Sequence, residues 1–254
     1  NLLHLNLGNG TFGSQPVGSP GYTAWSSNWG DFDNDGDQDL ITIGFWDAES
    51  RFYQNDGLGN LTDITNFFPN IFPLATNGSN SNGVIFVDED NDGWLDLHIT
   101  QPGPGVADYF YHNLGAPCKS WLEIKLTGTE SNRAAIGATL RAKANINGAP
   151  VWQMRQVSAQ TSATGQNPQR QHFGFDQAAV ADTLIVEWPS GATCVFTQFA
   201  LNRLVEIVED CSVNVLKEAT PVEGSTNLLT LCTPAKDTLL TPPSGPGGTW
   251  TASC

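Results

Sequence analysis

The sequence has few basic residues, with 11 Lys and Arg against 26 Asp and Glu, a formal net charge of −15 and a pI near 4.3. Binding to nucleic acid needs a Lys/Arg surface that neutralises phosphates, so this composition excludes nucleic acid as a partner. Long apolar runs are also lacking, because none approaches the roughly 20 residues that cross a bilayer. The start shows no basic and apolar leader pattern, so we expect no membrane insertion and a leader peptide that is already removed.

Catalytic motifs are lacking as well. The chain contains no G-x-S-x-G elbow, P-loop, H-E-x-x-H helix or dinucleotide fingerprint. The histidines occur singly, and each is predicted to be structural: His4, His98, His112 and His172. We therefore predict a protein that is not an enzyme and has no catalytic residues.

Five cysteines occur, none in C-x-x-C spacing: Cys118, Cys194, Cys211, Cys232 and Cys254. In an oxidising compartment such thiols can pair. An odd count leaves either a free thiol or a partner beyond this chain.

Two acidic stretches dominate what is present. Residues 31–39 and 88–96 both read D-x-D-x-D-G-x-x-D, with carboxylates at positions 1, 3, 5 and 9 and glycine at position 6. Calcium takes six to eight oxygen ligands, which carboxylates and a backbone carbonyl supply. The predicted ligands are the side chains of Asp31, Asp33, Asp35 and Asp39 with the carbonyl of Asp37, and the side chains of Asp88, Asp90, Asp92 and Asp96 with the carbonyl of Trp94. The sequence thus predicts two Ca²⁺ sites.

These stretches differ from an EF-hand, which needs a bidentate Glu at loop position 12 and a helix on each side. Position 12 is Thr42 in the first copy and Ile99 in the second. The β-branched residues after each loop favour strands. We therefore expect nine-residue loops between strands.

The first loop, G-D-F-D-N-D-G-D-x-D-L, is followed by F-Y-Q-N-D-G-L-G-N, whose turn also occurs near the start of the chain as Asn6–Phe12. Together these motifs resemble FG-GAP/VCBS repeats, the blades of β-propellers such as the integrin α-subunit head. The resemblance covers residues 1–117 and implies loops that hold Ca²⁺ at one rim of a blade. Two loops and part of a third blade do not close a ring of typically 4–8 blades, so we expect a piece of a longer protein or blades covered by something else.

From residue 118 the pattern changes to period-2 alternation, typical of half-buried strands. Strands are predicted at 119–126, 137–144, 151–157, 183–188, 194–197 and 204–208. Four motifs, W-L-E-I-K-L-x-G, S-N-R-x-x-I-G-A, R-x-H-F-G-F and V-E-W-P-S-G, are similar to the ASPIC/UnbV domain. This domain commonly follows FG-GAP/VCBS repeats in secreted proteins, including the cartilage acidic protein group. The resemblance implies an antiparallel, sandwich- or barrel-like module over 118–210 with no assigned catalysis.

The last segment, 211–254, contains possible strands at 213–216 and 227–231 and a Pro/Gly-rich run before Trp250. Two alternatives remain open: part of an immunoglobulin-like domain, or an extended tail that lies on the preceding domain.

Taken together, the sequence predicts an all-β protein that is secreted or lies at the cell surface, with calcium-stabilised propeller-type blades. The expected function is non-catalytic adhesion or scaffolding, with a protein partner. That partner can be a second copy: a tail strand completing the open sheet of the next subunit gives a head-to-tail filament. Alternatives are a monomeric fragment of a long adhesin, or a glycan-binding module in which Trp25, Trp29 and Trp46 stack on sugars.

Overall fold

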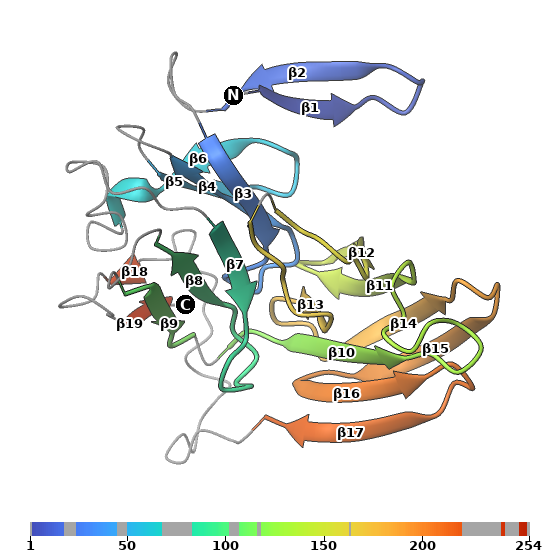
Figure 1. Ribbon diagram of the computed structural model, residues 1–254. Coiled ribbons are helices and arrows are strands. Elements are labelled where there is room, and N and C mark those ends of the chain that lie inside the picture. Colours follow the sequence, from blue (N-terminus) through green and yellow to red (C-terminus); the bar gives the residue numbers. More distant parts are fainter. Residues whose placement is uncertain are drawn as a thin grey trace.

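The computed structural model describes residues 2–17, 24–44, 50–67, 83–101, 107–115, 118–162 and 164–219, together with the backbone at 240–241 and 249–252. Apart from one 3₁₀ turn, Thr65–Phe67, the regular elements in these ranges are all strands. Figure 1 shows propeller-like blades beside a second body built of two sheets. The all-β fold class is confirmed.

The first blade is a four-stranded antiparallel meander in the order β3-β4-β5-β6. Its strands are β3 (Ala24–Gly30), β4 (Asp39–Gly44), β5 (Arg51–Asn55) and β6 (Leu61–Asp63). A hairpin precedes this blade and consists of β1 (Leu2–Asn6) and β2 (Phe12–Pro16). The first acidic loop joins β3 to β4, so it lies between strands as expected.

The second blade repeats this plan with β7 (Gly83–Val87), β8 (Asp96–Thr100) and β9 (Tyr109–Asn113). The second acidic loop joins β7 to β8. Strand β19 (Thr249–Ala252) lies parallel to β9, and β18 (Leu240–Thr241) pairs with β19. The tail of the chain therefore returns to the edge of this blade, while the predicted strand at 227–231 lies outside the described residues.

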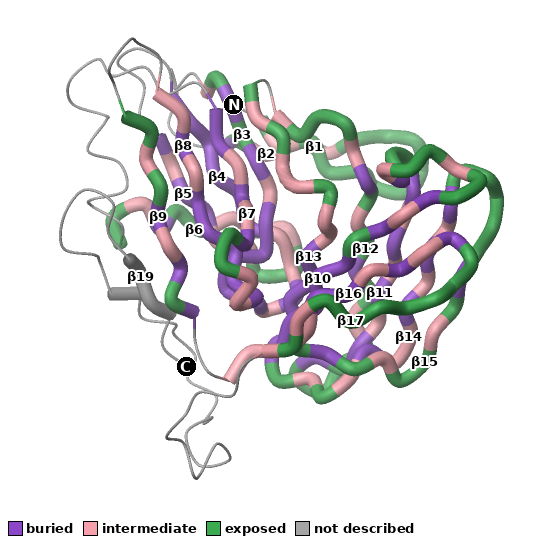
Figure 2. Tube along the Cα trace, turned by 60° about the horizontal axis from the view of Figure 1, so that its bottom comes forward, coloured by how far each residue is buried: buried purple, intermediate pink, exposed green. Residues whose placement is uncertain are grey.

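The two blades pack face to face through one apolar cluster. Its members come from both blades and include Phe32, Ile41, Ile43, Phe52, Val84, Phe86, Leu97, Ile99 and Tyr111. The approach is close: a Cβ on Gly30 would lie 2.6 Å from the ring of Phe86. Figure 2 shows these facing strands as largely buried. This packing holds the two acidic loops at one end of the pair of blades.

The second body consists of two four-stranded sheets that enclose a separate core. The first sheet has the order β13-β10-β16-β17, with β13 (Gln171–Gly174), β10 (Trp121–Thr127), β16 (Arg203–Val208) and β17 (Val213–Glu218). The second has the order β12-β11-β14-β15, with β12 (Ala149–Gln156), β11 (Thr139–Ile146), β14 (Val180–Glu187) and β15 (Thr193–Ala200). Because β17 pairs with β16, the first sheet continues past residue 210 to Glu218.

One pairing differs from the expected antiparallel arrangement. Strands β10 and β16 run parallel, from Leu122 opposite Arg203 to Thr127 opposite Val208. Parallel neighbours need a long crossover, and here the whole second sheet lies between them in the sequence. Alternation of side chains shows which face a strand buries and not which neighbour it pairs with, so the sequence did not reveal this.

Two further contacts fasten the second body. A disulfide joins Cys194 to Cys211. The Glu209 carboxylate accepts hydrogen bonds from the N–H groups of residues 129–131 at 2.7–2.8 Å and from the hydroxyls of Ser131 and Ser190. Two of the four sequence motifs of this domain, those that contain Ser131 and Ser190, therefore meet at one carboxylate.

Candidate metal centres at the acidic loops

The two acidic loops share one backbone conformation. Position 4 is left-handed in both, with φ of 56° at Asn34 and 58° at Asn91. Position 6 is also left-handed, at 101° for Gly36 and 91° for Gly93. Asparagine tolerates this region and glycine enters it without strain, so the N-D-G run at positions 4–6 gives each loop its tight turn.

The carboxylate at position 1 holds this turn together. Asp31 accepts hydrogen bonds from the N–H groups of Asp35 and Gly36, both at 3.1 Å. Asp88 accepts the same two bonds in its own loop, at 3.0 and 2.9 Å. Each of these aspartates therefore fixes the backbone around the glycine.

The carboxylate at position 9 ties each loop to the third strand of its blade. Asp39 accepts from the N–H of Phe32 at 3.3 Å and from that of Asn55 at 3.0 Å. Asp96 accepts from the N–H of Glu89, at position 2 of its own loop, at 3.1 Å and from the N–H of Asn113 at 2.8 Å. Each position-9 carboxylate thus joins the start of its loop to the end of the third strand.

These bonds bring three carboxylates of each loop together. Oxygens of Asp31, Asp33 and Asp39 lie within 4.8 Å of one another, and the equivalent group contains Asp88, Asp90 and Asp96. The position-5 carboxylates of Asp35 and Asp92 instead accept the N–H of position 7, Asp37 at 3.0 Å and Trp94 at 2.9 Å. The structure thus brings together six of the ten predicted residues, three at each loop, and Asp92 also groups with Asp90 and His112. That Asp35 and the carbonyls of Asp37 and Trp94 complete the ligand sets stays a prediction.

Two further residues approach the centres, and neither was predicted from the sequence. The amide nitrogen of Gln54 donates to Asp33 at 2.8 Å. His112 lies in the equivalent place, with Nδ1 3.0 Å from Asp96 and Nε2 3.5 Å from Asp90. The signal that would have found them is the repeat of F-Y-Q-N as F-Y-H-N at the end of the third strand of each blade.

Burial makes the first centre costly to ionise. It is the main cause that raises the pKa of Asp33 and Asp37 to about 7, and of Asp31 and Asp39 well above the usual range, with the neighbouring carboxylates adding to it. In the second centre burial raises the pKa of Asp88 to about 6 and of Asp92 to about 7. Asp90 is exposed.

The donor set fits a bound cation. Within the described residues, Oδ1 of Asp33 and Oδ1 of Asp37 are buried and accept no hydrogen bond. Buried charges are normally paired or coordinate a metal. A cation at these oxygens would offset their burial and mutual repulsion, so both clusters can hold a metal ion.

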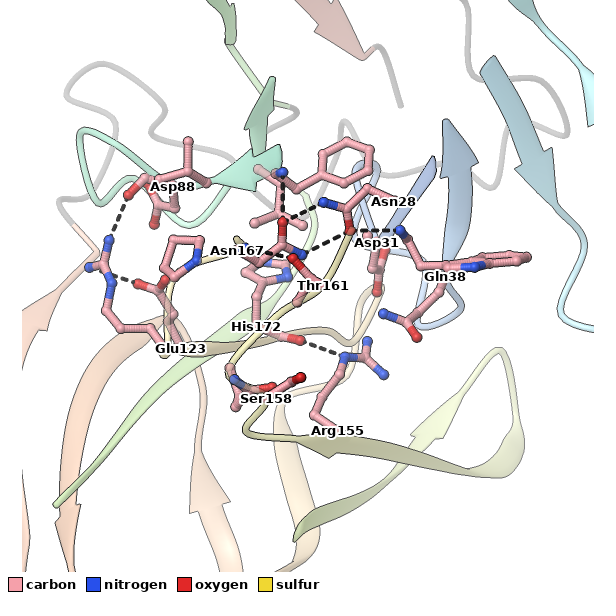
Figure 3. Close-up of a pocket in the computed structure, with 18 of the residues that line it drawn as sticks. Asn28, Asp31, Gln38, Asp88, Glu123, Arg155, Ser158, Thr161, Asn167 and His172 are labelled. Atoms are coloured by element: carbon pink, nitrogen blue, oxygen red, sulfur yellow. Dashed lines mark hydrogen bonds and ion pairs between the residues drawn. The ribbon is translucent and has the colours of Figure 1, made fainter. Parts of the chain in front are cut away.

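A cleft lies where the loops meet the second body. It has a volume of about 330 Å³, and Figure 3 shows His172 between Asp31 and Asp88, with Arg155 and Glu123 on the side of the second body. Burial lowers the pKa of His172 to about 4, so its imidazole is neutral.

Two family models match the chain. A model described as an FG-GAP-like repeat matches residues 1–42, and one described as ASPIC and UnbV matches residues 128–213. The first match contains the first acidic loop, whereas the second loop lies outside both. No curated protein matches the chain. Within the described part of the chain, no helix is long and apolar enough to cross a membrane.

Proposed function

Because the chain contains an FG-GAP-like repeat followed by an ASPIC/UnbV domain, a combination of extracellular-type β-propeller proteins, we propose a specific role for its acidic loops. Each binds one Ca²⁺ ion, and the protein is a secreted, non-catalytic scaffold or adhesion protein. The two ions are structural.

The observation that carries this proposal is the agreement between the two loops. Their position-4 and position-6 conformations and their position-1, position-5 and position-9 hydrogen bonds are the same. Their surroundings differ, since Asp33 is buried and its equivalent Asp90 is exposed. If the loops were only structural turns, nothing would require the same four carboxylates in a buried loop and in a more exposed one. A bound ion would require them, because it needs the same oxygen ligands in both places.

The type of ligand supports calcium over other ions. The ligands that the two loops share are all oxygens, and oxygen ligands suit hard cations rather than zinc or copper. Magnesium demands near-ideal octahedral geometry and keeps several waters, whereas calcium accepts six to eight oxygens in flexible geometry. A cation also holds the carboxylates ionised, which makes them unsuitable for proton transfer and supports a non-catalytic role.

The position of the tail supports self-association as the scaffold's mode of assembly. Strand β19 adds to the edge of β9 in the same chain, with Thr249 opposite His112 and Trp250 opposite Asn113. The same edge can accept that strand from a neighbouring subunit, which would give head-to-tail polymers. Sedimentation in millimolar calcium and after chelation tests this: long calcium-dependent polymers support it, and a compact monomer in both conditions refutes it.

A glycan partner has less support. Of the three tryptophans considered for sugar stacking, Trp25 is 49% exposed. Trp29 packs against the small apolar cluster between the hairpin and the first blade, and Trp46 lies outside the described residues.

Calorimetric titration with calcium tests the loops directly. We expect the wild-type chain to bind two ions. Asp33→Asn removes a ligand from the first loop and Asp90→Asn removes one from the second, so each variant should bind one ion. The control is Glu130→Gln, which removes one exposed charge far from the loops. Heat of binding that is absent in the wild type, or equal in all four proteins, would contradict the assignment.

A further inference from the structure

The second body reaches both acidic loops through one short strand, β13, and the residues beside it. At the first loop, the N–H of Gly174 donates to Oδ2 of Asp31 at 3.0 Å. The N–H of Asp176 donates to the carbonyl of Asn34 at 2.8 Å. Asp31 thus receives three backbone N–H groups, two from its own loop and one from the other domain.

At the second loop, the same strand contacts the backbone. His172 Nε2 donates to the carbonyl of Gly93 at 3.0 Å, and Arg170 donates to the carbonyl of Asp88 at 2.8 Å. The side chain of Asn34 donates to the same Gly93 carbonyl at 3.0 Å. The first loop, β13 and the second loop therefore form one connected hydrogen-bond network.

Beside the cleft, the two glycines at this junction are tightly packed. A Cβ on Gly174 would lie 2.3 Å from Oδ2 of Asp31 and 2.4 Å from the Cα of Asn34. A Cβ on Gly93 would lie 1.8 Å from the ring of Trp121 on β10. Small shifts of β13 must therefore move the carboxylate of Asp31 in the first loop.

Charge is arranged in the same sense. The chain has only 11 Lys and Arg, and among the residues that the structure describes, four on the side of the second body act on the loops. Burial raises the pKa of the loop carboxylates, and the positive charges of Lys119, Arg155 and Arg170 partly offset that rise. The ammonium of Lys217 donates to the carbonyl of Asp90 at 2.8 Å. These cations attract the acidic loops and orient the second body toward them.

We propose that the ASPIC/UnbV domain is a structural part of both metal centres: β13 positions Asp31 and the backbone of the second loop, so each loop binds its ion tightly only with the domain docked. Because coupling between two equilibria is reciprocal, ion binding in turn holds the domain against the blades. This inference rests on the proposed calcium sites and adds that the two domains cooperate in forming them.

Gly174→Ala in the full chain is the central test, with Gly13→Ala as the matched control, since a Cβ on Gly13 would meet only Leu7, at 3.4 Å. The added Cβ displaces the N–H of Gly174 from the Asp31 carboxylate. Because this hydrogen bond is to a charged group, its loss should raise the dissociation constant for calcium about tenfold. We expect that rise for the first loop of Gly174→Ala and no change for Gly13→Ala, measured by calcium titration.

Arg170→Lys provides a second test that keeps the positive charge beside Glu123, its ion-pair partner at 3.1 Å. It removes the guanidinium that donates to the Asp88 carbonyl, so the second loop should weaken several-fold while the first keeps its affinity. Small-angle X-ray scattering of the wild type should show a larger radius of gyration after chelation, as the docked domain is released.

The outcomes separate the two proposals. A wild type that binds no calcium overturns the calcium assignment and the coupling together. A wild type that binds two ions, with unchanged affinities in Gly174→Ala and Arg170→Lys, overturns the coupling alone. A radius of gyration that does not respond to chelation overturns the claim that the ions hold the domain in place.

Discussion

Raising the pH is expected to destabilise the metal-free protein and to have less effect on the calcium-loaded one. Burial raises the pKa of Asp33, Asp37 and Asp92 to about 7 from a usual 3.8. In the metal-free state the folded protein therefore retains protons that the unfolded chain has released. Its stability must fall as the pH rises through 7, because the folded state then loses those protons.

The magnitude can be worked out over the range from pH 6.5 to 8.5. One buried carboxyl with a pKa of about 7 loses about 0.8 kcal/mol of stability across this range. Asp33 is buried and counts in full, whereas Asp37 and Asp92 are half-buried and count for roughly half because water screens them. The three together amount to about 1.6 kcal/mol, or about 3–6 °C in melting temperature for a chain of this size.

Two other groups decide how the measurement is made. His172, whose pKa is lowered to about 4, is protonated differently in the folded and unfolded states up to about pH 7.5, because the unfolded imidazole is still half protonated at about pH 6.5; this applies with or without calcium. Glu123 has its pKa raised to about 8 by burial, and it lowers stability over the same range with or without calcium. The informative quantity is therefore the difference between the metal-free and the calcium-loaded protein in how far the melting temperature falls as the pH rises.

The assay is a set of thermal melts at pH 6.5 and 8.5, in excess chelator and in millimolar calcium. Bound calcium keeps the loop carboxylates ionised at both pH values, so only the metal-free sample should show the additional fall. A metal-free melting temperature that is equal or higher at pH 8.5 would refute the burial argument. An equal fall in both samples would show that calcium does not bind at these carboxylates.

Three further changes test the scaffold around the loops. Glu209→Gln should lower the melting temperature by several degrees in calorimetry, because an amide nitrogen replaces an oxygen that accepts backbone and hydroxyl donors; an unchanged melt would contradict this. Reducing the Cys194–Cys211 disulfide should cost about 3 kcal/mol, seen as a lower urea midpoint, and Cys194→Ala should lose its response to reductant. Gly93→Ala should fail to reach the native circular dichroism spectrum, because its Cβ overlaps a tryptophan ring; a native-like spectrum would refute this packing.

Much of the fold could be predicted because its determinants are local. The D-x-D-x-D-G run specifies its own turn, since the glycine and the asparagine before it accept left-handed conformations and the first aspartate binds the nearby N–H groups. Alternation located six strands of the ASPIC/UnbV domain to within a few residues: the predicted 137–144 is β11, Thr139–Ile146, in the structure. The short β13, Gln171–Gly174, was not among the predicted strand ranges. The FG-GAP-like and ASPIC/UnbV resemblances are confirmed.

What the sequence did not reveal depends on contacts between distant segments. The parallel pairing of β10 with β16 is one example, because side-chain alternation is the same for either strand direction. His112 is another: alone it resembles any structural histidine, and only the return of β9 to the second loop brings it beside Asp96. The contacts of β13 and its neighbours with the first loop come from the backbone N–H groups of Gly174 and Asp176, which leave no trace in side-chain patterns. Those with the second loop come from Arg170 and His172, whose backbone acceptors lie about 80 residues away in the sequence.

The two loops also show how one local motif acquires two different environments. Both have the same turn and the same bonds from within the loop and from the third strand of the blade, so these local contacts give their carboxylates a common arrangement. In the first loop, β13 contacts Asp31, and both Asp31 and Asp33 are buried, whereas in the second loop Asp90 is exposed. A buried carboxylate gains more from a cation than an exposed one, because less water competes for its charge. The neighbouring ASPIC/UnbV domain, and not the loop sequence, therefore makes the first centre the one whose stability depends most on its ion.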